Sequence, residues 1–125
     1  MKLAKHIMNK MVVKISQSDS ISKAVELMKK HNVSQMPVVS KGKITGALTR
    51  ERLAHEALKH RSKSAFLAIQ VREIMDEPFP VINASTDLNT ISALFGRSDA
   101  VLVTDKGKIV GIITEADVIR EMIER

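Results

Sequence analysis

The fold of this chain follows from the stretch Leu102-Val-Thr-Asp-Lys-Gly-Lys-Ile-Val-Gly-Ile-Ile-Thr-Glu-Ala-Asp117, which predicts two short apolar strands, a tight turn between them and a helix after them. The same pattern occurs earlier, in Pro37-Val-Val-Ser-Lys-Gly-Lys-Ile-Thr-Gly-Ala-Leu-Thr-Arg-Glu-Arg52. The glycines and the threonine recur at one offset of 65 positions: Gly42 as Gly107, Gly46 as Gly111 and Thr49 as Thr114. A fixed offset with matching glycines indicates an internal duplication.

The segment before each hairpin is duplicated as well. A helical turn at His6-Ile-Met8 returns 67 positions later as Glu73-Ile-Met75, and each is followed by a short predicted strand, at 12–15 and 79–82. Proline cannot donate to a sheet ladder, so the prolines at 78 and 80 predict that the second of these strands is short and lies at an edge.

Helical spacing of apolar residues completes each copy. Ser20 is the expected N-cap of a first helix, and Gly96 is expected to end its counterpart at 88–95. Amphipathic helices at 50–60 and 116–123 close the two copies. Each copy thus predicts an α/β unit in the order β-α-β-β-α. Because one such unit cannot bury its own sheet face, we expect the two to pack about a pseudo-two-fold axis as one pair.

The predicted boundaries place repeat 1 at residues 1–62 and repeat 2 at residues 63–125. The polar run Arg61-Ser-Lys-Ser64 breaks the apolar pattern, so a linker is expected at about 61–70.

Composition narrows the class of protein. The 125 residues include no cysteine, which excludes disulfides, thiolate zinc sites and cysteine nucleophiles. No apolar run reaches the ~18 residues of a membrane span, and the first residues lack the apolar core of a signal peptide, so a cytoplasmic location is expected. The net charge of +6 is uneven, with +10 over residues 1–63 and −4 over 64–125. The basic half fits an anionic partner such as a nucleotide or nucleic acid, or simply solvated surface lysines.

Three motifs stand in the same strand–turn–strand–helix order: Val33-Ser-Gln-Met-Pro-Val-Val39, Gly46-Ala-Leu-Thr49 and Gly111-Ile-Ile-Thr-Glu-Ala-Asp117. In these motifs each copy resembles a CBS domain, and the chain resembles a tandem CBS pair, or Bateman module, over about residues 4–125.

Thr114 and Asp117 are the main candidates for ligand binding. A hydroxyl followed three residues later by a carboxylate is, first, a helix-capping pattern. The carboxylate also suits a ribose diol, and the helix N-terminus suits a phosphate. The CBS resemblance implies that these two residues are the family's ribose- and phosphate-contacting motif.

The resemblance further implies that such a site lies in a cleft between the repeats and holds an adenine ring. The residues expected to face Thr114 and Asp117 are Met11, Val12, Val13, Gln35, Met36 and Pro37. For Met11, Val12 and Met36, ordinary core packing remains the alternative.

The second, pseudo-symmetric site is expected to be degenerate. Its residues would be Thr49, Arg52, Phe79 and Pro80, with an arginine in place of the ribose-binding aspartate. Arg52 could pair with Glu51 or Asp99, or reach a phosphate. One competent site is therefore expected.

Many nucleotide-binding members of the family carry basic residues before the Pro-Val-Val strand. Ser34 and Gln35 stand there in this chain. This difference favours a ligand with few phosphates, or an adenosyl compound such as S-adenosylmethionine or methylthioadenosine.

We therefore expect a non-enzymatic regulatory module that senses an adenine nucleotide or adenosyl ligand and needs no cofactor. The CBS resemblance also implies a homodimer that packs through the amphipathic helices. No nucleophile or acid–base pair can be assembled, and His55 and His60 are five apart, off the spacing of a helical metal pair. The alternatives are an interaction scaffold with vestigial sites, recruiting a protein partner, and a basic nucleic-acid-binding protein. Few aromatic residues argue against single-strand binding.

Overall fold

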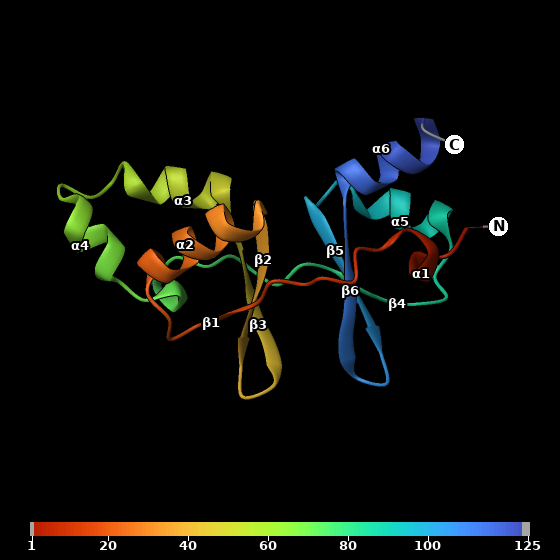
Figure 1. The fold of residues 1–125 in the computed structure, drawn as a ribbon, viewed down its shortest axis with the longest axis horizontal. Coiled ribbons are helices and arrows are strands. Elements are labelled where there is room, and N and C mark those ends of the chain that lie inside the picture. Colours follow the sequence, from red (N-terminus) through yellow and green to blue (C-terminus); the bar gives the residue numbers. More distant parts are fainter. Residues whose placement is uncertain (1, 124–125) are drawn as a thin grey trace. The chain divides into compact units, whose positions relative to one another are not determined.

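The computed structural model describes residues 2–123 apart from the side chain of Met122; Met1, Glu124 and Arg125, at the limits of the predicted repeats, lie outside the described residues. The α/β class and the duplicated order are confirmed (Figure 1). One three-stranded sheet has the order β1-β2-β3 and the other β4-β5-β6. The strands are β1 (Ile15–Ser16), β2 (Gln35–Ser40), β3 (Lys43–Thr49), β4 (Val81–Asn83), β5 (Ala100–Asp105) and β6 (Lys108–Thr114).

In each sheet the short first strand pairs in parallel with the second, and the second pairs antiparallel with the third. The edge position predicted for the proline-flanked strand is therefore confirmed for β4. The helices are α1 (Ala4–Ile7), α2 (Ile21–His31), α3 (Arg50–Ala57), α4 (Lys63–Ala68), η1 (Val71–Glu73), α5 (Leu88–Leu94) and α6 (Glu115–Ile123).

The chain forms two compact units that do not coincide with the two repeats. Unit 1 consists of Met1–Val12 and Phe79–Arg125, and unit 2 of Val13–Pro78. In unit 1, Asn9 and Ile112 exchange two backbone hydrogen bonds of 2.9 and 3.0 Å; in unit 2, Ala47 and Asp76 exchange two of 2.9 Å. The opening segment of each repeat thus belongs to the unit that contains the sheet of the other repeat.

The repeated lysine–glycine pairs make the hairpin turns. Lys41 and Gly42 have φ of 51° and 76°, and Lys106 and Gly107 have φ of 52° and 79°. Two successive residues with positive φ match the twist of the flanking strands, and glycine takes this conformation without steric cost.

Helix ends follow the sequence only in part. Ser20 caps α2 as predicted, since its hydroxyl accepts from the Lys23 N–H at 3.2 Å. The α5 helix ends at Leu94, with Phe95 as C-cap in a right-handed conformation. Gly96 is the next residue, so the helix ends beside it as predicted, but its φ is not positive and it does not form a left-handed cap.

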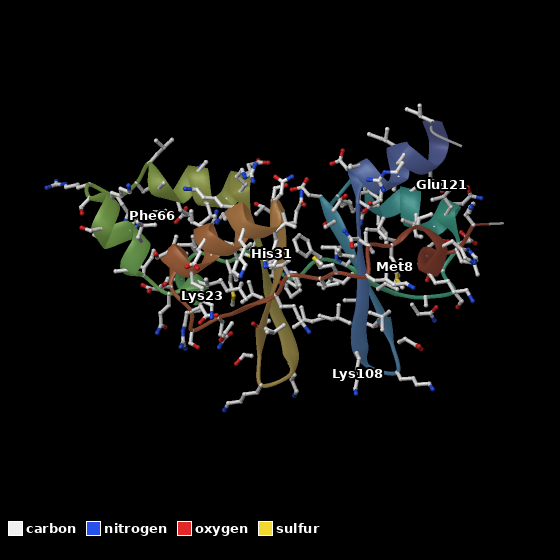
Figure 2. All side chains as sticks on the ribbon, in the orientation of Figure 1. Met8, Lys23, His31, Phe66, Lys108 and Glu121 are labelled. Atoms are coloured by element: carbon white, nitrogen blue, oxygen red, sulfur yellow. The ribbon has the colours of Figure 1, made fainter. Side chains whose placement is uncertain are left out.

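The segment expected to be a linker contains a helix. Ser62 caps α4 through a 3.2 Å bond from the Ala65 N–H. The aromatic ring of Phe66, on α4, is buried in the core of unit 2 (Figure 2). Leu67 and Ile69 pack against the same core, so this apolar contact fixes the helix onto the unit.

Each unit has its own apolar core. In unit 2 the core joins α2 to the inner face of the sheet, around Ile21, Met28 and Leu48. In unit 1 it joins α1 and α5 to the sheet, around Ala4, Ile91 and Ile113. These cores hold the strand ends from which α3 and α6 begin.

We expect Asp87→Asn to remove part of the acid sensitivity of this fold. Asp87 caps α5 and accepts a 2.8 Å bond from the Thr90 N–H, which lowers the pKa of its carboxyl below the ordinary value. Because the pKa of Asp87 is lower in the folded state, its ionised carboxylate stabilises the fold at pH values above the unfolded-state pKa of about 3.9. This contribution is lost as the pH falls through the folded-state pKa. The stability difference between wild type and variant should therefore be largest near pH 7 and shrink toward pH 2.5, as measured by urea unfolding.

The matched control for this measurement is Ser20→Ala, which removes an uncharged cap. It should cost about 1 kcal/mol at every pH tested. An Asp87→Asn difference that stays constant from pH 7 to 2.5 would contradict the assignment.

Candidate functional site

Thr114 and Asp117 meet at the start of α6. Asp117 Oδ2 accepts hydrogen bonds from the Thr114 backbone N–H at 2.8 Å and from the Thr114 hydroxyl at 3.1 Å. The Asp117 side chain is buried, with 8% of the residue exposed. The carboxylate thus closes the first turn of the helix as half of a capping box. Two of the sequence-predicted site residues are therefore in direct contact.

A third residue, Arg120, completes this cluster. Its guanidinium nitrogen lies 3.1 Å from Asp117 Oδ1, the oxygen that Thr114 leaves open. The arginine side chain is 57% exposed. Sequence reasoning missed it, although spacing of three residues on a helix is the signal that predicts such a pair.

The corresponding position of the first repeat is capped in a different way. Thr49 Oγ1 accepts from the Arg52 backbone N–H at 3.0 Å, which is the ordinary N-cap bond. Because an arginine stands where the other repeat has Asp117, the carboxylate acceptor is absent there.

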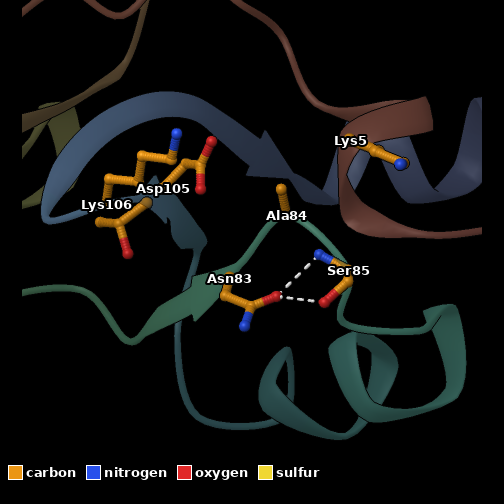
Figure 3. A pocket seen from close by; sticks show the side chains of 7 residues that line it. Lys5, Asn83, Ala84, Ser85, Asp105 and Lys106 are labelled. Atoms are coloured by element: carbon orange, nitrogen blue, oxygen red, sulfur yellow. Dashed lines mark hydrogen bonds between the residues drawn. The ribbon is translucent and has the colours of Figure 1, made fainter.

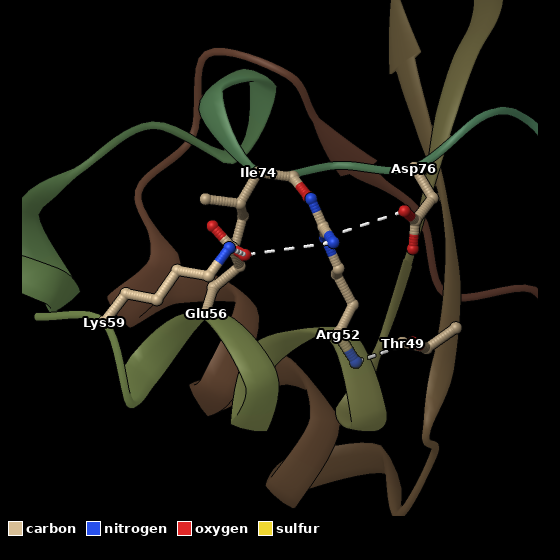
Figure 4. A network of polar contacts seen from close by, with 6 residues as sticks. All are labelled: Thr49, Arg52, Glu56, Lys59, Ile74 and Asp76. Atoms are coloured by element: carbon tan, nitrogen blue, oxygen red, sulfur yellow. Dashed lines mark hydrogen bonds and ion pairs between the residues drawn. The ribbon is translucent and has the colours of Figure 1, made fainter.

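Arg52 instead ties α3 to the segment after η1, within unit 2 (Figure 4). Its Nε donates to the Ile74 carbonyl at 2.8 Å and lies 3.6 Å from Asp76 Oδ1. Its Nη1 lies 3.8 Å from Glu56 Oε2, which also accepts a 2.8 Å bond from Lys59 Nζ. The Lys59 hydrogen bond lowers the pKa of Glu56, with burial opposing it.

The expected partners of Arg52 are therefore corrected. Among the described residues its carboxylate partners are Glu56 and Asp76, rather than Glu51 or Asp99. Glu56 lies one helical turn away on the same face, whereas Glu51 is the adjacent residue and points elsewhere. Asp99 belongs to unit 1.

The remaining predicted contacts of the main site are divided between the units. Met11 and Val12 belong to unit 1, while Val13, Gln35, Met36 and Pro37 belong to unit 2. Met11 is 68% exposed, which excludes the alternative of core packing for it. Met36 is fully buried in the unit 2 core, as that alternative predicts, and Pro37 is buried as well.

The residues of the degenerate site are divided in the same way. Thr49 and Arg52 belong to unit 2, and Phe79 and Pro80 to unit 1. Phe79 is buried, and the Pro80 carbonyl accepts from the Leu102 N–H at 2.9 Å, so this segment runs along β5.

Unit 1 also has a polar hollow of about 420 Å³ that contains none of the predicted site residues (Figure 3). On one wall Asn83 Oδ1 accepts from the backbone N–H and the hydroxyl of Ser85, at 2.7 and 2.6 Å. The hollow is lined by Lys5, Asn83, Ala84, Ser85, Thr104, Asp105 and Lys106.

Residues 2–123 contain no cluster of three or more His, Cys, Asp or Glu side chains placed to hold a metal ion. Over the same residues, no helix is long and apolar enough to cross a membrane.

A family model for the CBS domain matches residues 4–59 and 71–124. The chain belongs to the CBS-domain family. The resemblance seen in the two glycine-marked hairpins is thereby confirmed, and with it the tandem pair. CBS pairs are regulatory, ligand-binding modules in general.

Two relatives are longer proteins, of which this chain spans about a third or less. The chain is 30% identical to a zinc metalloprotease of Methanocaldococcus jannaschii over 95% of its own length, but spans only 32% of that protein. It is 30% identical to cystathionine beta-synthase of Dictyostelium discoideum over 90% of its length, and spans 23% of that protein. A solved protein with CBS domains from Burkholderia ambifaria has the same fold, with a TM-score of 0.86 at 23% identity, over 98% of this chain and 95% of that one.

Proposed function

We propose that this CBS pair is a non-enzymatic regulatory module that binds an adenosine-containing small molecule, of the adenine nucleotide or S-adenosylmethionine type, at Thr114 and Asp117. The observation that supports this proposal is a buried carboxylate at the N-terminus of α6, fixed by its own threonine. A carboxylate has about four acceptor positions, and Thr114 occupies two of them on one oxygen. The other oxygen accepts one bond from Arg120 and keeps one open position for a ribose hydroxyl.

The start of α6 adds a second attraction for such a ligand. Backbone N–H groups of the first turn and the positive end of the helix dipole favour an anionic group. With nine residues, α6 is long enough for its N-terminus to carry this partial positive charge. Phosphate-bearing and uncharged adenosyl ligands both carry the diol that Asp117 would accept.

One binding site per chain is proposed, because the first repeat offers no equivalent acceptor. Arg52 occupies the corresponding position, donates a hydrogen bond to the Ile74 carbonyl and forms an ion pair with Asp76. An arginine cannot accept a hydrogen bond from a ribose hydroxyl. The residues Met11, Val12, Val13, Gln35, Met36 and Pro37 stay predicted ligand contacts.

We expect Asp117→Asn to reduce the ligand stabilisation by about half or more, without unfolding the protein. Thermal unfolding would be followed with AMP, ADP, ATP, S-adenosylmethionine and methylthioadenosine. A ligand at 100 times its Kd adds about 2.7 kcal/mol to the folded state. The asparagine keeps one acceptor for the Thr114 N–H, but loses the negative charge and one oxygen, so affinity should fall by about tenfold or more.

The matched control is Asp87→Asn, which makes the same chemical change at another helix start of unit 1. It should leave every ligand shift unchanged. If none of the five compounds stabilises the wild type, the scaffold alternative replaces the proposal, and Thr114 and Asp117 are a helix cap alone.

A homodimer is part of the proposal. Exposed apolar side chains on the closing helix of unit 1 support it: Ile119 is 54% exposed and Ile123 74%. In unit 2 the residue after α3, Leu58, is 90% exposed. The regulated partner and the cytoplasmic location stay predictions.

A further inference from the structure

We propose that Arg120 selects 5′-phosphorylated ligands at the Asp117 site, by leaving the carboxylate when a ribose binds and pairing with the phosphate instead. This inference rests on the proposed function. It starts from the 3.1 Å contact between the Arg120 guanidinium and Asp117 Oδ1.

The carboxylate of Asp117 has about four acceptor positions, two on each oxygen. Oδ2 already accepts two bonds from Thr114, which fills its two lone-pair positions. Oδ1 has two positions, and Arg120 occupies one of them. A ribose presents two neighbouring hydroxyls, each of which needs an acceptor. With Arg120 in place only one hydroxyl can be satisfied, so full recognition of the diol requires the arginine to move.

The two partners of this contact differ in how freely they can move. Asp117 is 8% exposed and is fixed by the backbone of its own helix turn. Arg120 carries a long side chain that is 57% exposed, and among the described residues Asp117 is its carboxylate partner in an ion pair. We therefore expect the Arg120 side chain, and not Asp117, to move when a ribose binds.

A displaced guanidinium needs a new partner close to the bound ligand. A phosphate at the 5′ position of the same ribose supplies a dianionic acceptor that a guanidinium binds through two parallel bonds. A 5′ thioether, as in methylthioadenosine, supplies none. For that ligand, the lost Arg120–Asp117 pair is a cost without compensation. Arg120 thus lowers the affinity for the uncharged ligand and raises the affinity for the phosphorylated one.

The test compares AMP with methylthioadenosine, which share adenine and the ribose diol, by isothermal titration calorimetry on the whole chain. Wild type should prefer AMP by about tenfold or more. In Arg120→Met, which keeps much of the apolar stem, AMP affinity should fall by about tenfold while methylthioadenosine affinity rises. Arg72→Met, which removes an exposed arginine of unit 2, is the charge-matched control and should change neither affinity.

The opposite responses of the two ligands separate selection from a structural role. If Arg120 merely held Asp117 in place, both affinities would fall together, and that result would overturn the inference. Unchanged affinities for both ligands would overturn it as well, while leaving the Asp117 site intact if Asp117→Asn still weakens binding. Binding of neither ligand to wild type would overturn both proposals. A 2′-deoxy form of AMP should bind more weakly than AMP to wild type, because it offers Asp117 one hydroxyl.

Discussion

Leu48→Ala and Ile113→Ala should each lower the free energy of unfolding by about 2–5 kcal/mol. The two residues occupy the same place in the two repeats, on β3 and β6, and both are fully buried. Leu48 belongs to the core of unit 2 and Ile113 to the core of unit 1. Each truncation removes buried methyl and methylene groups and leaves a cavity that tightly packed strands cannot fill.

Urea unfolding monitored by circular dichroism would measure both losses. Leu58→Ala is the control, because this leucine is 90% exposed and its truncation should change stability by less than about 0.5 kcal/mol. A loss below about 1 kcal/mol for either buried residue would show that its core differs from the one described here.

Gly46→Ala and Gly111→Ala should each cost about 1–3 kcal/mol, although alanine adds a single methyl group. A Cβ built at Gly46 would lie 2.6 Å from Met75 Sδ and 2.9 Å from the Asp76 carbonyl oxygen. A Cβ at Gly111 would collide with the side chain of Met8, again within one unit. Because glycine has no side chain, the segment with Met75 and Asp76 can lie against Gly46 on β3, and the segment with Met8 can lie against Gly111 on β6.

Second-site changes show which atoms cause the cost. Met8→Ala in the Gly111→Ala background should recover part of the loss, because it removes the Met8 Sδ and Cγ atoms but keeps the Cβ, which lies 2.9 Å away. Met75→Ala should also rescue Gly46→Ala in part, because it removes the Met75 Sδ and Cγ atoms but leaves the Asp76 carbonyl oxygen at 2.9 Å. Stability losses that simply add in both double variants would contradict this account.

Gly96→Ala is the matched control for these glycines. No atom lies within 4 Å of a Cβ built there, and its φ is not positive. The substitution should be neutral or slightly stabilising, because alanine restricts the unfolded chain.

Local signals in the sequence predicted most of the fold. The Ser20 cap, the Lys-Gly turns and the edge position of the proline-flanked strand each depend on a few neighbouring residues, and all are confirmed. Because the chain is duplicated, the hairpin pattern in one repeat supports the same prediction in the other. The helix at Lys63–Ala68 was missed because its six residues make fewer than two turns, which is too short for apolar residues to show a helical period.

The site was less predictable, because its contacts depend on distance in space. The pairing of Thr114 with Asp117 follows from spacing alone and is observed. The partners of Arg52 include Ile74 and Asp76, more than 20 residues away, and no local pattern indicates them. For Met36, an apolar residue in a strand, the sequence cannot separate a ligand contact from core packing.

The exchange of opening segments has a consequence for how the chain is made. Unit 2 is one continuous stretch, so its sheet and helices can close once Pro78 has left the ribosome. Unit 1 must join residues 1–12 to residues from 79 onward, so α1 waits, with Ala4 and Ile7 unburied, until β6 has been synthesised. During translation α1 is made before all of unit 2 but is placed after it, and the apolar face that α1 presents meanwhile is only one turn long.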